Sequence, residues 1–196
     1  MKRLFALVLT LILVVFIGVV AEAQTINNEV RVSAGVHDVE DVTVFHGRAE
    51  LRKKLSERFA FTDVGSITTD GDTNLFYNTA LVRFAPVEHV FVAGGIGVGK
   101  LTDADTFVNP TVQLGANFSF SRVNFEPFVQ LETPDLVSDN NVRSLSANLN
   151  VKIAVTESFG FIGTGQLKSS RTDNRFFNER FAALEKTATG GVYFSF

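Results

Sequence analysis

Charged side chains recur at every second position in two segments near the start of the sequence. The pattern covers Glu29 and Arg31, and then His46, Arg48, Glu50 and Arg52. In an extended strand, residues two apart point to the same side, so each set shares one face. Carboxylates and guanidinium groups that meet on such faces form charge-assisted hydrogen bonds. The spacing therefore predicts ion pairing wherever these two faces come together.

Further charges continue the pattern on the polar faces of later segments. They are Arg83, Glu126, Glu132, Lys152 and Glu185. Both signs are represented, so mutual neutralisation is feasible, and unpaired charges would be costly to bury. The whole set is predicted to form one charge network on the polar side of a sheet.

Two short motifs resemble ligand-binding loops but lack residues that such loops require. Residues 94–100 match the start of a phosphate-binding loop, but Leu101 stands where a Mg²⁺-binding hydroxyl is needed and no helix signal follows. We expect these glycines to let the strand bend or to let inward side chains pack. Residues 70–74 resemble a calcium loop, yet Leu75 and Leu81 occupy the positions that need Gly and Glu. We expect no metal site and no cofactor.

Alternation with period two runs from Glu29 to the end and predicts an all-β, up-and-down antiparallel barrel of about ten strands. The expected strands cover 30–36, 45–51, 59–61, 75–84, 90–98, 112–120, 125–131, 145–153, 159–167 and 184–196. Eight strands is the alternative, because 59–61 is short. Short connections near 54–58, 86–89, 121–124 and 156–158 alternate with longer ones at 37–43, 63–74, 100–110, 133–143 and 168–180.

The polar face indicates which side of the barrel faces outward. In 111–119 and 144–152 it consists mainly of Ser, Thr, Asn and Gln, with few of the charges that a solvated surface carries. Small hydrogen-bonding side chains suit a crowded polar lumen. The apolar face would then contact lipid, with Phe and Leu at the strand ends. A soluble lipocalin-like barrel with its apolar face inward is the alternative.

Both ends of the sequence carry signals of export. Lys2 and Arg3 precede a long apolar run, and Ala21-Glu22-Ala23 has the form of a cleavage site. This layout predicts a secretory signal peptide over 1–23 and a barrel domain over 24–196, with an uncleaved anchor as the alternative. At the other end, Val192, Phe194 and Phe196 share one apolar face.

A C-terminal strand that ends in Phe is typical of bacterial outer-membrane barrels, and the chain resembles the small barrels of the OmpX/OmpW-like type. The resemblance implies a bacterial outer-membrane location, with lipid and lipopolysaccharide around a monomer. It also implies that Val192, Phe194 and Phe196 are the signal read by the barrel-insertion machinery. The net charge of −3 argues against a nucleic-acid partner.

The sequence leaves three functions open. A small barrel is nearly filled by its own side chains, so we expect a largely plugged lumen and a role in envelope structure and surface interaction. A narrow conduit for ions or small solutes and a periplasmic ligand-binding barrel are the alternatives. The last long connection mixes cations with aromatics and is a candidate contact for lipopolysaccharide phosphate or a protein. Its residues are Arg171, Arg175, Phe176, Phe177 and Arg180.

Some enzymes are built on similar barrels, and their catalytic residues can be compared with the residues of this sequence. Omptin-family proteases use an Asp pair facing an Asp–His pair. Asp70 and Asp72 could supply the first pair, but 133–143 contains no His for the second. Lipid A deacylases use a His and a Ser two apart, and none of the three histidines has such a partner. Since hydrolysis needs a base within reach of its nucleophile, we expect no enzyme.

Overall fold

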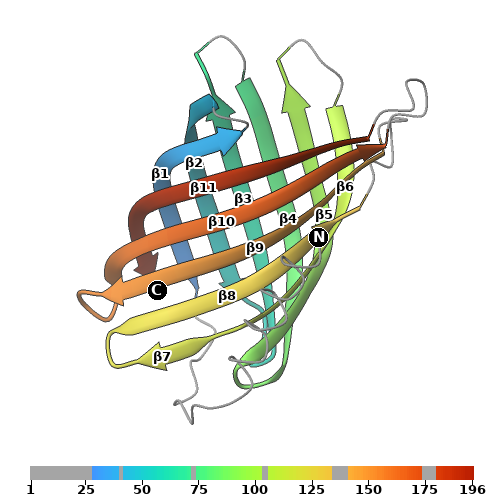
Figure 1. The fold of residues 1–196 in the computed structure, drawn as a ribbon. Coiled ribbons are helices and arrows are strands. Elements are labelled where there is room, and N and C mark those ends of the chain that lie inside the picture. Colours follow the sequence, from blue (N-terminus) through green and yellow to red (C-terminus); the bar gives the residue numbers. More distant parts are fainter. Residues whose placement is uncertain (1–27, 40–41, 72–73, 103–105, 134–140, 174–179) are drawn as a thin grey trace.

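One antiparallel sheet contains every strand of the described residues (Figure 1). The computed structural model describes residues 28–39, 42–71, 74–102, 106–133, 141–173 and 180–196. The strands are β1 (Glu29–Val39), β2 (Val42–Lys54), β3 (Phe59–Thr69), β4 (Asn74–Val87), β5 (Val90–Leu101), β6 (Thr106–Ala116), β7 (Phe118–Phe120), β8 (Val123–Glu132), β9 (Asn141–Ala154), β10 (Phe159–Asp173) and β11 (Arg180–Ser195). Within these ranges no helix is long and apolar enough to cross a membrane.

The sheet closes on itself because both of its ends are paired. β1 pairs with β2 on one side and β11 on the other, and β6 pairs with β8. β6 and β7 are two parts of one strand interrupted at Asn117, since both pair with β8. The result is a closed antiparallel barrel of ten strands in sequence order. The expected fold is confirmed, and the eight-stranded alternative is wrong.

Several strands run further than the sequence predicts. β3, expected to be short, continues to Thr69, and β10 and β11 span 15 and 16 residues. Asp63 belongs to the strand rather than to a connection, because it pairs with Leu51 of β2 and with Ala80 of β4. Small polar residues on both faces of β3 hide the alternation from sequence analysis.

The outer and inner surfaces of the barrel differ sharply in polarity. Apolar side chains face outward, with 53% of Phe161 and 49% of Val112 exposed. Polar side chains fill the inside, where Ser146 and Asn148 are each only 3% exposed. A soluble lipocalin-like barrel has the reverse polarity, so that alternative is wrong. An apolar patch of Leu81, Phe91 and Phe128 also lies inside, which the sequence did not predict.

Phenylalanine rings surround one rim of the barrel. This rim carries the connections 55–58, 88–89, 121–122 and 155–158, and we call it the turn side. Ring centroids lie 4.9 Å apart for Phe59 and Phe84, 5.2 Å for Phe159 and Phe194, and 6.1 Å for Phe120 and Phe125. Bulky aromatics at strand ends suit the boundary between hydrocarbon and headgroups. The signal peptide predicted over 1–23 lies outside the described residues and stays a prediction.

Candidate functional site

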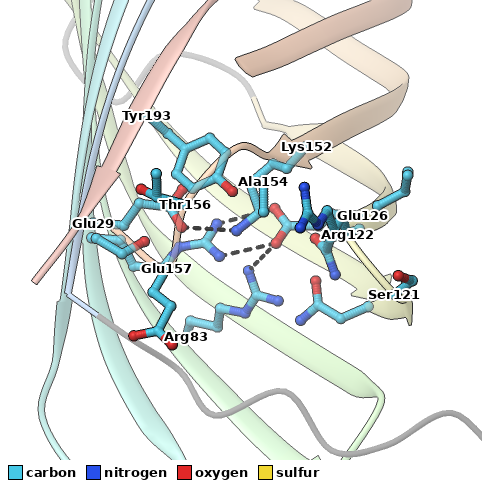
Figure 2. Close-up of a pocket in the computed structure, with 15 residues that line it drawn as sticks. Glu29, Arg83, Ser121, Arg122, Glu126, Lys152, Ala154, Thr156, Glu157 and Tyr193 are labelled. Atoms are coloured by element: carbon cyan, nitrogen blue, oxygen red, sulfur yellow. Dashed lines mark hydrogen bonds and ion pairs between the residues drawn. The ribbon is translucent and has the colours of Figure 1, made fainter. Parts of the chain in front are cut away.

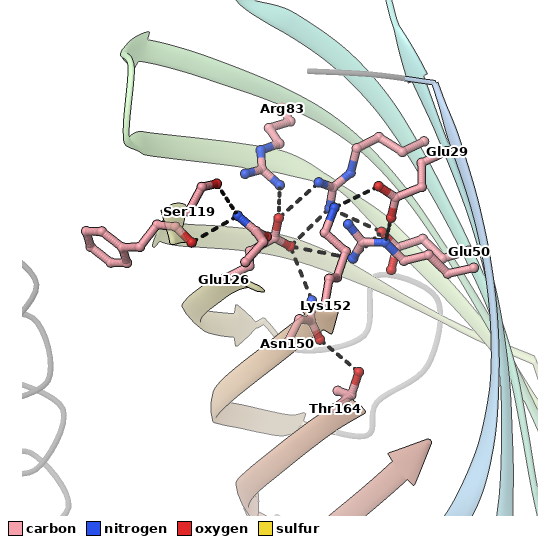
Figure 3. Close-up of polar contacts among 12 residues, drawn as sticks. Glu29, Glu50, Arg83, Ser119, Glu126, Asn150, Lys152 and Thr164 are labelled. Carbon is pink, nitrogen blue, oxygen red and sulfur yellow. Dashed lines mark hydrogen bonds and ion pairs between the residues drawn. The ribbon is translucent and has the colours of Figure 1, made fainter. Parts of the chain in front are cut away.

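Glu126 on β8 accepts hydrogen bonds from three other strands (Figure 3). Arg52 of β2 donates through both terminal nitrogens, at 2.9 Å to Oε2 and 3.0 Å to Oε1. Arg83 of β4 donates to Oε2 at 3.0 Å, and Asn150 of β9 donates to Oε1 at 3.2 Å. β2 and β4 are not sheet neighbours of β8. The two arginines therefore reach Glu126 across the interior of the barrel.

Two more carboxylates extend the contacts to β1 and β2. Glu50 lies 2.9 Å from Arg48 Nη2 and 3.2 Å from both Arg52 Nη2 and Arg31 Nη1. On β1, Glu29 accepts from Lys152 Nζ at 2.8 Å and from Arg31 Nε. We call this set the lumen cluster. Its members are Glu29, Arg31, Arg48, Glu50, Arg52, Arg83, Glu126 and Lys152.

The lumen cluster is buried and carries more cations than carboxylates. Glu29, Arg31, Glu50, Arg83 and Glu126 are each no more than 4% exposed. Three carboxylates face the guanidinium and ammonium groups of five basic residues. Buried charges of this kind are tolerated only when they are paired and hydrogen-bonded. Each carboxylate is therefore indispensable to the charge balance of the lumen.

Non-carboxylate partners help to accommodate the surplus cation at Arg83. Its Cζ lies 3.3 Å from the ring centroid of Phe91, a cation–π contact inside the apolar patch. With its amide oriented to satisfy both neighbours, Asn117 donates to Glu126 Oε2 at 2.9 Å and accepts from Arg83 Nη2 at 2.6 Å. The strand interruption between β6 and β7 thus falls at a residue that completes the cluster.

Two cavities flank the lumen cluster. The turn-side cavity has a volume of about 170 Å³ and lies against Glu29, Arg83, Glu126 and Lys152, which converge on it in Figure 2. The second cavity, of about 390 Å³, lies toward the opposite rim, where β1, β3 and β10 end. Arg48 lines this loop-side cavity, whereas Arg52 lines the turn-side cavity. The cluster thus separates two hollow regions of the lumen.

Three residues of the predicted network lie apart from the cluster, in the loop-side cavity. Glu132 contacts Lys168 at 3.3 Å, and Glu185 contacts His37 at 3.6 Å. His46 is hydrogen-bonded to Thr68 at 2.9 Å. Alternation places Glu126 and Glu132 on one face of β8 but leaves them about 20 Å apart along the strand. The sequence predicts the shared face, whereas the partners that each carboxylate meets depend on register.

Asn117, Asn150 and Phe91 complete the cluster. Sequence analysis placed Asn117 and Asn150 on the polar faces of their strands but included none of the three in the charge network. Asn150 shares a polar face with Lys152, so alternation gave a signal for it. Nothing in the sequence around Asn117 indicates the interruption between β6 and β7. Phe91 lies on the inner face of β5, as the alternation of that strand requires. It was missed because the lumen was expected to be polar.

One arrangement in the loop-side cavity resembles a catalytic triad. His37 Nδ1 lies 2.7 Å from Thr187 Oγ1, and His37 Nε2 lies 3.6 Å from Glu185 Oε2. A hydrolase also needs donors aimed at the developing oxyanion. Thr187 lies within β11, opposite His37 in the β1–β11 pairing, and strand amides point along the sheet rather than into the lumen. The described geometry is a hydrogen-bonded His–Thr pair with a carboxylate near the other ring nitrogen.

The described residues contain no group of three or more His, Cys, Asp or Glu side chains that could hold a metal ion. Of the Asp pair that resembles the omptin pair, Asp70 is described and Asp72 is not. The residues predicted to contact lipopolysaccharide also fall outside the described side chains. They are Arg171, Arg175, Phe176, Phe177 and Arg180, and their role stays a prediction.

The residues of the predicted insertion signal lie in β11 or directly after it. Phe194 and Phe196 are 49% and 74% exposed, and Val192 pairs with Val32 of β1 and with Phe161 of β10. All three belong to the outer apolar face at the turn side. Their recognition by the insertion machinery stays a prediction.

No family model matches the sequence, and neither does any curated protein. Among solved structures, the outer membrane protease OmpT from Escherichia coli is similar with a TM-score of 0.60 and 8% identity, over 89% of this chain and 98% of that one. The KdgM porin has a TM-score of 0.41 and 9% identity, over 87% and 99% of the two chains. Ail, the attachment invasion locus protein of Yersinia pestis, has a TM-score of 0.36 and 12% identity, over 87% and 99%.

At these identities the likeness concerns the fold alone, and it does not reach the OmpX/OmpW-like type specifically. The fold of OmpT agrees with the features described above: a closed antiparallel sheet, an apolar exterior and a polar interior. Together they show that this chain is a small β-barrel protein of the bacterial outer membrane.

Proposed function

We propose that the lumen cluster plugs the barrel, and that the protein serves envelope structure and surface interaction rather than open diffusion. The observation that carries this proposal is the position of Glu126. It holds Arg52 and Arg83 from strands across the lumen, with heavy-atom distances of 2.9–3.0 Å. Long side chains locked in this way fill the cross-section of a small barrel.

A narrow conduit is the second candidate, and the two cavities favour it. About 390 Å³ of space on one side of the cluster and 170 Å³ on the other would join if the arginines moved. Moving them would leave buried charges without partners, which costs several kcal/mol for each broken pair. The closed state is therefore the one that we expect at rest.

Single-channel recording in planar lipid bilayers tests this proposal. We expect the unmodified protein to be silent, and the double variant Arg52→Ala/Glu126→Ala to show discrete conductance steps because it removes two side chains that meet in mid-lumen. The matched control is Lys53→Ala/Glu88→Ala, which removes one cation and one anion from exposed positions. Steady conductance by the unmodified protein would establish the conduit instead. A silent double variant would show that other groups close the lumen.

The proposed role involves no catalysis, although the structural neighbour OmpT is a protease. Support comes from the described part of the lumen, where Glu126 and Glu50 are held in ion pairs and Thr187, the hydroxyl bonded to His37, lies within a regular strand. Contacts with lipopolysaccharide, assembly by the insertion machinery and a monomeric state belong to the same proposal. Replacing Arg171, Arg175 and Arg180 with Ser should weaken binding to lipid A. Unchanged binding would refute that contact.

A further inference from the structure

The loop-side cavity has a floor made of two aromatic rings. Tyr77 on β4 and Phe107 on β6 lie on either side of β5, with ring centroids 5.9 Å apart and ring planes inclined by only 24°. Both side chains line the cavity. The two nearly parallel rings give the cavity an apolar aromatic surface in a lumen that is otherwise largely polar. This surface suits a flat or gently puckered ring as its partner.

Glycines of β5 make room for these rings. A Cβ atom on Gly97 would overlap the Tyr77 hydroxyl, and a Cβ atom on Gly99 would overlap the ring of Phe107. Because the two positions lack side chains, the rings can occupy the space next to β5. The glycine-rich segment that resembles a phosphate loop thus keeps the cavity open.

Amide and hydroxyl groups line the remaining walls. Gln113 Nε2 donates to Gln130 Oε1 at 2.7 Å, and Gln130 Nε2 donates to Glu132 Oε1 at 2.8 Å. On another wall, Gln166 Nε2 donates to Asn148 Oδ1 at 2.7 Å. Each amide has two N–H donors and two acceptor lone pairs, so these bonds fix its orientation and leave capacity for a ligand.

The two basic side chains Lys168 and Arg48, which line the cavity, already have carboxylate partners. Lys168 lies 3.3 Å from Glu132, and Arg48 lies 2.9 Å from Glu50. Glu185 accepts a hydrogen bond from Ser170 and faces His37. An anionic or cationic ligand would have to break such a pair, whereas a neutral ligand would not. The volume of about 390 Å³ falls in the range of small-molecule sites.

We propose that the loop-side cavity binds a neutral saccharide of one or two rings. The C–H face of a pyranose would lie on Tyr77 and Phe107, while its hydroxyls would exchange hydrogen bonds with the glutamine amides. An aromatic floor, orienting amides and internally paired charges together favour this class over apolar or ionic ligands. The inference goes beyond the plugged barrel and does not depend on whether the lumen conducts.

Calorimetric titration of the purified barrel with a panel of neutral mono- and disaccharides tests the proposal. The panel covers gluco, galacto and manno configurations, the anionic comparator is digalacturonic acid, and the detergent is lauryldimethylamine oxide, which has no sugar headgroup. We expect at least one neutral sugar to bind with a Kd below about 10 mM. Tyrosine fluorescence gives a second readout, since a Tyr193→Phe variant leaves Tyr77 as the only tyrosine in a chain without tryptophan.

Matched variants tie any binding to this cavity. Tyr77→Ala and Gly99→Ala should each weaken sugar binding about tenfold or more. The first removes one ring of the aromatic floor, and the second adds a methyl group that displaces the ring of Phe107. Phe76→Ala and Gly94→Ala should leave sugar binding unchanged, since Phe76 is 54% exposed on the outer face and a Cβ atom on Gly94 meets open space. Failure of the whole neutral panel, preference for digalacturonic acid, or unchanged binding by Tyr77→Ala would overturn the proposal.

Discussion

At the scale of single residues, Glu126 is the group on which the lumen cluster depends most. Replacing Glu126 with Gln keeps the side-chain shape but leaves Arg52 and Arg83 without the carboxylate that they share. Breaking a buried ion pair from one side typically costs about 3–5 kcal/mol. We expect a loss of this size in the free energy of unfolding, measured with urea in lipid vesicles.

The partners of Glu126 offer an internal check on that explanation. Adding Arg83→Met to Glu126→Gln removes one uncompensated cation and places a flexible apolar side chain on Phe91, so part of the lost stability should return. Glu88→Gln, at an exposed position in a turn, should change stability by less than about 0.5 kcal/mol. Equal stability of Glu126→Gln and the unmodified protein would mean that the cluster does not hold the barrel together.

At the scale of strands, the seam between β1 and β11 closes the barrel and depends on close backbone approach. A Cβ atom on Gly191 would overlap the carbonyl oxygen of Val32, whereas one on Gly190 would meet nothing within 4 Å. Gly191→Ala should therefore destabilise the barrel by about 1–3 kcal/mol, and Gly190→Ala should not. The readout is the temperature at which the compact band disappears in gels of unheated samples. Equal effects of the two substitutions would show that the seam tolerates a methyl group.

Strands also show what sequence can and cannot predict here. Alternation predicted ten strands because burial of one face imposes period two on the residues. The same rule did not predict the end of β3, where both faces carry small residues. It also did not predict the interruption at Asn117. It placed Glu126 and Glu132 on one face but could not predict which side chains of other strands each one meets, since that follows from register and strand tilt.

Side-chain direction was the second limit on prediction from the sequence. The glycines of β5 were expected to give inward side chains room, and they do so for Tyr77 and Phe107. Which rings would use that room depends on how β4, β5 and β6 pair, because Gly99 lies opposite Tyr77 on one side and Phe107 on the other. The sequence alone therefore indicates that the glycines of β5 leave space, but not which side chains fill that space.

At the scale of the whole molecule, the barrel has a polar interior and an apolar exterior. The ion pairs inside gain strength from exclusion of water, while Phe161, Val112 and other outer residues need lipid to cover them. The ring of phenylalanines at the turn side places one boundary of the hydrocarbon there. Stability of this fold is therefore a property of the protein together with its bilayer.

A charge placed on the outer face tests that dependence directly. Leu149 faces outward within β9 and is 42% exposed, whereas Leu55 is 57% exposed in the turn between β2 and β3. Leu149→Arg should cost about 2–4 kcal/mol in lipid vesicles, and Leu55→Arg about 0–1 kcal/mol, because arginine is most costly near the bilayer midplane. Urea unfolding of both variants measures the difference. On a water-facing surface both substitutions would be nearly neutral, so equal stabilities would contradict the membrane-spanning assignment of β9.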